Sequence, residues 1–137
     1  MIEHDLPPDS MSPAAARELM RHELAHACGS LVAGATAVRI TDDGSSWRSD
    51  AEWSAPPDEF SVLVGFLSGP RLVPAGASGN DRLMMAVVPD PLKSRVLAFI
   101  DLNVAKVLAE FTDEAIDAMA VQMVRGEGVM IRQRVTQ

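Results

Sequence analysis

The stretch from Ala14 to Ala33 contains no proline, is rich in alanine and follows a clear helix-start signal, Ser12-Pro13. The hydroxyl of a serine at this position can accept a hydrogen bond from an amide in the first helical turn. Proline is favoured in that turn because its missing N–H would have no partner there. The residues that dominate the stretch are strong helix formers. The sequence therefore predicts a helix from Pro13 to about Ala33, ended by Gly34.

The predicted helix carries the motif His22-Glu23-Leu24-Ala25-His26. A spacing of four residues puts His22 and His26 on one helical face, one turn apart, where two imidazoles can bind the same zinc ion. Glu23 lies beside that face, where it can act as a general base towards water that the metal activates. The chain has three histidines, and finding two of them in this arrangement by chance is improbable. The motif predicts a Zn²⁺ site with the chemistry of a hydrolase.

A catalytic zinc ion normally has three protein ligands, so the two histidines leave one position to another residue. His4 is the remaining histidine, and it lies in an acidic, proline-rich segment, residues 1–12, that we expect to be a mobile arm. The expected third ligand is therefore a carboxylate. Asp81 stands out because it opens a predicted helix after a Gly-Ala-Ser-Gly-Asn loop. Spacing alone leaves other candidates: Asp42, Asp43, Asp50, Glu52, Asp58 and Glu59.

The remainder of the chain predicts one small β element and several helices. Alternating side chains predict a strand over residues 36–41, and a turn then leads to a second strand within residues 47–54. Four further segments are predicted to be helical: residues 58–68, 81–88, 92–111 and 113–125. The first of these is ended by Gly69-Pro70, and we expect it to be buried because it is apolar on all sides. The fold class is therefore mainly α with a small β-hairpin or sheet (α+β), in a single domain over residues 13–137.

Composition argues against several classes of function. The chain has 12 Lys and Arg against 19 Asp and Glu, and the resulting net charge of −7 disfavours a nucleic-acid partner. Its single cysteine, Cys28, cannot form an internal disulfide and is expected to be a small core residue. No apolar run is long enough to span a bilayer, and the acidic amino terminus is unlike a secretory signal. We expect a cytoplasmic protein without a membrane partner.

Several motifs resemble the peptidase domain of the FtsH-type AAA zinc metalloproteases. The histidine motif, His22 to Ala27, is similar to that family's H-E-A-G-H-A, and residues 37–41 and 66–71 are similar to its next strand and to its glycine-rich helix end. Residues 76–81 are similar to its G-A-S-N-D segment, in which the aspartate is the third zinc ligand. The resemblance covers residues 13–130. It implies a zincin-like fold, Asp81 as the third ligand and zinc metalloendopeptidase activity.

The chain departs from that family in ways that bear on its substrates. It has no nucleotide-binding loop, Ala25 replaces the usual glycine, and the usual acidic residue near Arg71 is absent. We expect ATP-independent hydrolysis of peptides or unstructured protein segments. Two alternatives stay open. One is a non-cleaving metal-binding or regulatory interaction module that retains the metalloprotease fold, and the other is a zincin of another clan with Glu52 or Glu59 as the third ligand.

The predicted strands bear on how a substrate would be held. An exposed edge of the strand over residues 36–40, or of the one near Trp53, can pair with an extended peptide. The two tryptophans, Trp47 and Trp53, lie in this region. They either line a subsite or close a small core, and general burial preferences favour the second role.

Overall fold

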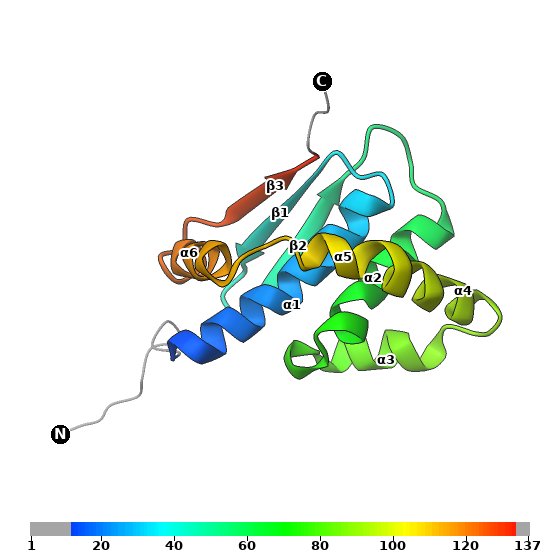
Figure 1. Cartoon of the computed structure of the whole chain (residues 1–137), viewed down its shortest axis with the longest axis horizontal. Coiled ribbons are helices and arrows are strands. Elements are labelled where there is room, and N and C mark those ends of the chain that lie inside the picture. The colour runs from blue at the N-terminus through cyan, green and yellow to red at the C-terminus, as the bar shows by residue number, and fades with distance from the viewer. Residues whose placement is uncertain (1–11, 134–137) are drawn as a thin grey trace.

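The computed structural model describes residues 12–133, and most other elements pack on its first helix, α1 (Pro13–Val32) (Figure 1). The helix begins as predicted, because Ser12 Oγ accepts a hydrogen bond from the Ala15 N–H at 3.2 Å. Side chains on several faces of α1 are buried, including Met20, Leu24 and Cys28. In Figure 1, α1 lies between the sheet and α3 (Gly79–Val87). Apart from Ser12, the arm predicted over residues 1–12 is outside the described residues.

Two predicted strands form an antiparallel pair. β1 (Ala37–Asp42) and β2 (Trp47–Glu52) are in register from Ala37 opposite Glu52 to Asp42 opposite Trp47. Asp43 closes the hairpin, since its Oδ1 accepts hydrogen bonds from the N–H groups of Ser45 and Ser46, both at 2.9 Å. The predicted hairpin is confirmed.

The chain after the last helix forms a third strand, which was not predicted from the sequence. β3 (Val129–Arg132) pairs antiparallel with β1, which gives a three-stranded sheet in the order β2-β1-β3. The turn into β3 contains Gly128 at φ +73°, a left-handed conformation that favours glycine. Because β1 is the central strand, one edge of β2 has no strand partner among residues 12–133.

The second long helix, α2 (Glu59–Leu72), extends past its predicted end. Asp58 caps it by accepting the Ser61 N–H at 2.8 Å, and the final turn includes Pro70. Proline removes one backbone hydrogen bond, but its fixed φ is compatible with a helix, and the helix ends two residues later. Burial along α2 was also overestimated, because the Phe66 side chain is 43% exposed.

The remaining helices lie close to their predicted ranges. A short 3-10 turn, η2 (Pro74–Gly76), leads to α3, which ends just before Pro89. The predicted helix over residues 92–111 is a helical run with one wider turn: α4 (Leu92–Phe99), the π-helical η3 (Ile100–Val104) and α5 (Ala105–Leu108). α6 (Asp113–Val124) begins at Thr112, whose Oγ1 accepts the Ala115 N–H at 3.1 Å.

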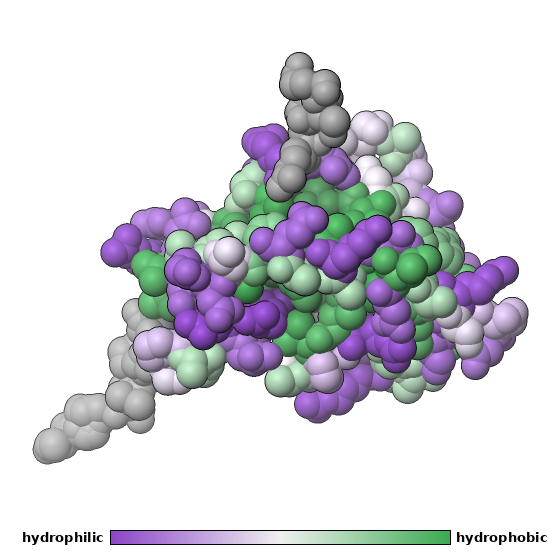
Figure 2. All heavy atoms as spheres, viewed as in Figure 1, coloured by the Kyte–Doolittle hydropathy of each residue, from purple (hydrophilic) through white to green (hydrophobic). Residues whose placement is uncertain are grey.

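One apolar core joins α1 to the sheet and to the other helices. It includes Leu24 of α1, Ile40 of β1, Leu67 of α2 and Ile116 of α6, all fully buried. On the face in Figure 2, hydrophilic side chains cover much of the outer helical surface, and hydrophobic ones show between them. Within residues 12–133, no helix combines the length and apolar character needed to cross a membrane. The fold is thus mainly helical with a small antiparallel sheet, and the expected fold class is confirmed at that level.

Candidate metal centre

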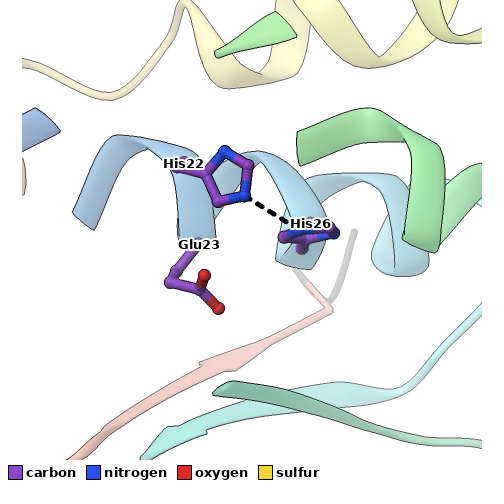
Figure 3. A group of neighbouring side chains, drawn as sticks. All are labelled: His22, Glu23 and His26. Carbon is purple, nitrogen blue, oxygen red and sulfur yellow. Dashed lines mark hydrogen bonds between the residues drawn. The ribbon is translucent and has the colours of Figure 1, made fainter. Parts of the chain in front are cut away.

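The two histidines of the motif point towards each other from successive turns of α1, as Figure 3 shows. Their Nε2 atoms are 3.2 Å apart, and their rings meet edge to face with centroids separated by 4.8 Å. The His22 side chain is almost completely buried, and that of His26 is 13% exposed. The helical spacing therefore brings both imidazoles to one point, as the sequence predicts.

Backbone carbonyl groups hold the other nitrogen of each ring. His22 Nδ1 lies 2.7 Å from the carbonyl oxygen of Val73, and His26 Nδ1 lies 2.9 Å from that of Gly65. A carbonyl oxygen can only accept a hydrogen bond, so each Nδ1 is the donor. In the neutral rings, the lone pairs of both Nε2 atoms are then free to bind a cation, as in metal sites where a hydrogen bond fixes the histidine tautomer.

Asp81 completes the group from the first turn of α3. Its Oδ2 is 2.9 Å from His22 Nε2, and its Oδ1 is 3.5 Å from His26 Nε2. A capping box fixes the carboxylate: Asp81 Oδ2 accepts the Ser78 N–H at 3.0 Å, and Ser78 Oγ accepts the Asp81 N–H at 3.1 Å. Burial favours the neutral acid, but the interactions of the carboxylate with the His22 and His26 rings hold the pKa of Asp81 well below its usual range. Asp81 is therefore a carboxylate in contact with both rings.

With both rings neutral, the two Nε2 atoms and the Asp81 carboxylate oxygens are all acceptors and cannot bond to one another, so a proton on a ring or a bound cation has to lie between them. In the absence of a metal ion, a proton meets that need. Burial lowers the pKa of His26, but the Asp81 and Glu23 carboxylates and the Gly65 carbonyl outweigh it, and the net pKa is raised. The spacing is also compatible with a metal ion: ligands about 2.0–2.1 Å from a tetrahedral zinc ion lie about 3.3–3.4 Å from each other. The observed distances are 3.2 Å between the two Nε2 atoms, 2.9 Å from His22 Nε2 to Asp81 Oδ2 and 3.5 Å from His26 Nε2 to Asp81 Oδ1.

The histidine side chains fit because the neighbouring residues Gly69 and Gly76 have no side chains. A Cβ atom on Gly69 of α2 would overlap the imidazole of His26, with Nε2 as the nearest atom. A Cβ atom on Gly76 would lie 2.6 Å from the Cβ atom of His22. Any side chain at these positions would displace a histidine, so α2 and η2 can approach the motif only as bare backbone.

The Glu23 carboxylate lies beside the histidines, on the side of α1 that faces the strands (Figure 3). Its side chain is nearly buried, and Oε1 accepts a hydrogen bond from Ser49 Oγ of β2 at 2.9 Å. Burial raises the pKa of Glu23, and this effect outweighs the opposing influence of His26 and Ser49. The ligand atoms of Glu23, His22 and His26 all lie within 4.8 Å of one another, so Glu23 is close enough to act on a molecule bound at the histidines.

An open groove of about 740 Å³ leads to these residues. Glu23, His26 and Asp81 lie in it, β2 forms one wall, and Val62 and Phe66 of α2 contribute to another. Trp47 and Trp53 both pack on the core, as burial preferences favour, and both line the groove, where a subsite role stays a prediction.

The structure brings together all four residues that the motifs predict for the site: His22, Glu23, His26 and Asp81. Among residues 12–133, no other acidic residue has a hydrogen bond or ion pair with either histidine. Neither Glu52 nor Glu59, the alternatives for a zincin of another clan, has such a contact with the histidines. His4 is outside the described residues. Other acidic candidates have local partners: Asp50 pairs with Arg48, and Asp58 caps α2. Ser49 was not predicted as a site residue, although it is one of the alternate residues of β2 whose side chains are half-buried, and that alternation was a usable signal.

No protein-family model matches this chain, and no curated protein or solved structure is significantly similar to it. The resemblance to the FtsH-type peptidase domain therefore stands on the short motifs alone. Any functional proposal must rest on the geometry of the site.

Proposed function

We propose that this protein is a zinc-dependent metallopeptidase that cleaves peptides or unstructured protein segments. The observation that carries the proposal is the convergence of acceptor atoms from His22, His26 and Asp81 beside a nearly buried glutamate that lines an open groove. A purely structural metal site does not require an additional carboxylate next to an accessible position.

His22, His26 and Asp81 would hold the zinc ion. When bound, zinc lowers the pKa of water and polarises the scissile carbonyl. Glu23 removes a proton from the water that attacks the carbonyl carbon, and it delivers that proton to the amine nitrogen as the C–N bond breaks. The raised pKa of Glu23 suits both steps, because the group must first accept and then release the same proton.

The edge of β2 that is unpaired within residues 12–133 supplies a way to hold the substrate. A peptide added as a strand along this edge would run through the groove and past Glu23. Pairing of this kind uses the peptide backbone and needs an extended chain, which favours peptides and unstructured segments over folded proteins.

The decisive experiment compares E23Q with H22A. We expect E23Q to retain stoichiometric zinc, measured by mass spectrometry of the metal after dialysis, and to lose cleavage of fluorescent casein by about 100-fold or more because it lacks the proton acceptor. H22A should lose both zinc and activity. Full turnover by E23Q would disprove the assigned role. Zinc binding by the parent protein with no cleavage of casein or unstructured peptides would favour the non-cleaving interaction module instead.

A further inference from the structure

We propose that Ser49 is a positioning residue that holds Glu23 in its working orientation and links it to the strand along which the substrate is bound. This inference rests on the proposed function. Its starting point is one hydrogen bond that joins two elements: Ser49 Oγ of β2 lies 2.9 Å from Glu23 Oε1 of α1. The motif itself supplies no partner for the glutamate.

The hydrogen bond to Oε1 leaves Oε2 of Glu23 as the oxygen that can accept a proton from water. Ser49 Oγ is also 3.4 Å from the main-chain oxygen of Glu23, but a hydroxyl has a single proton, and the shorter contact to the carboxylate takes it. Oε2 has no hydrogen-bond partner among residues 12–133. Ser49 therefore fixes the carboxylate by one oxygen and leaves the other available to a water molecule in the groove.

The position of Ser49 in β2 makes this contact sensitive to the substrate. Trp47, Ser49 and Ala51 are the half-buried side chains of the strand, whereas Arg48, Asp50 and Glu52 are exposed. Ser49 thus extends inwards to α1 from a strand whose outer edge has no strand partner in the part of the chain that the structure describes. A peptide that pairs with β2 would order the strand, and the hydroxyl would transmit that order to the Glu23 carboxylate. We therefore expect Ser49 to affect turnover more than zinc binding.

The test compares three variants of the zinc-loaded full chain. S49A removes the hydroxyl, S49T restores it on a β-branched residue that suits a strand, and S54A is the control. Ser54 follows β2 outside the groove, is exposed, and its hydroxyl makes no hydrogen bond among the described residues. With fluorescent casein, we expect kcat of S49A to fall about 10- to 100-fold, as when a supporting hydrogen bond at a metal site is removed. KM and zinc content should remain close to those of the parent protein. S49T should recover most of the activity, and S54A should match the parent.

The outcomes separate this proposal from the proposed function. If the parent cleaves casein and S49A retains its kcat, Ser49 has no positioning role while the peptidase proposal stands. The proposal is equally overturned if S49T is as slow as S49A, because the hydroxyl is then not the determinant. A parent protein that binds zinc but cleaves nothing defeats both proposals.

Discussion

At the scale of single residues, the site depends as much on absent side chains as on those present. Gly69 lies in the last part of α2, and a methyl group there would occupy the position of the His26 ring. Replacing a helical glycine by alanine ordinarily stabilises a helix by about 0.5–1 kcal/mol. At this position the local gain is opposed by displacement of a predicted zinc ligand.

We therefore expect G69A to lower the affinity for zinc by about 10-fold or more, the usual cost of disturbing a ligand's support. A competition titration with a chromophoric chelator measures the change. G79A is the matched control, since a Cβ atom at Gly79 of α3 meets nothing within 4 Å. If G69A bound zinc as tightly as the control, the ring of His26 would not lie where the structure places it.

Cys28 provides a second test at this scale, away from the groove. Its thiol is 1% exposed, and burial raises its pKa to about 12. An unfolded chain has a cysteine pKa of about 8.5, so between about pH 9 and 11 the unfolded state loses this proton and the folded state keeps it. The free energy of unfolding should then fall by up to about 1.4 kcal/mol per pH unit because of this group.

Denaturant unfolding of the parent and of C28A at several pH values isolates the contribution of Cys28. The parent should lose stability more steeply than C28A as the pH rises, and both should respond alike below about pH 8, where the thiol is protonated in either state. Parallel stability curves up to pH 11 would mean that the thiol is accessible to water in the folded protein.

The residues that the sequence identified are those whose chemistry shows in a short motif. His22, Glu23 and His26 follow from helical spacing, and Asp81 stands out as the first acidic residue after a flexible loop. The supporting contacts join elements far apart in the chain. The acceptors for the two Nδ1 atoms are main-chain oxygens, which any residue type could provide. Such contacts depend on packing, and a sequence pattern does not contain them.

At the scale of elements, the position of α3 depends on Asp81, a residue in its own first turn. No residue of α3 is buried, yet the helix carries Asp81. The Asp81 carboxylate serves two partners at once, the Ser78 N–H that starts the helix and the histidines of α1. Helix α3 and the candidate metal site should therefore stabilise each other.

S78A tests this coupling, with T112A as its control. Both side chains cap a helix by accepting an amide hydrogen bond at 3.1 Å, and loss of such a cap costs about 0.5–2 kcal/mol. We expect both variants to show similar losses in thermal unfolding without metal. S78A alone should also bind zinc more weakly in isothermal titration calorimetry, because it loosens Asp81. Equal zinc affinities in the two variants would contradict the coupling.

The two misjudged elements have different physical causes. Pro70 was expected to end α2, but a proline close to the end of a helix costs one hydrogen bond and preserves the helical φ. Val129 to Arg132 is too short to be recognised as a strand by its own pattern, and its pairing with β1 decides its conformation. Helices with cap residues, such as α1 and α6, were predicted well because their start signals are local.

At the scale of the whole molecule, the candidate ligands lie on two elements far apart in the sequence, α1 at the centre of the fold and α3 at its margin (Figure 1). A cation bound between His22, His26 and Asp81 links these elements in the folded state only. Any ligand with that property raises stability by an amount that grows with its concentration, about 2.7 kcal/mol at 100 times its Kd.

We therefore expect saturating zinc to raise the Tm of the parent by several degrees, about 10 °C if the stabilisation approaches that value. The size of the shift in two variants decides which carboxylate completes the site. If Asp81 is the ligand, D81N should lose most of the shift and E23Q should retain it. Glu23 is also near the histidines, so the opposite result would make Glu23 the ligand and remove the general base from the proposed reaction. Differential scanning fluorimetry with zinc and with a chelator, on all three proteins, distinguishes these arrangements without reference to catalytic activity.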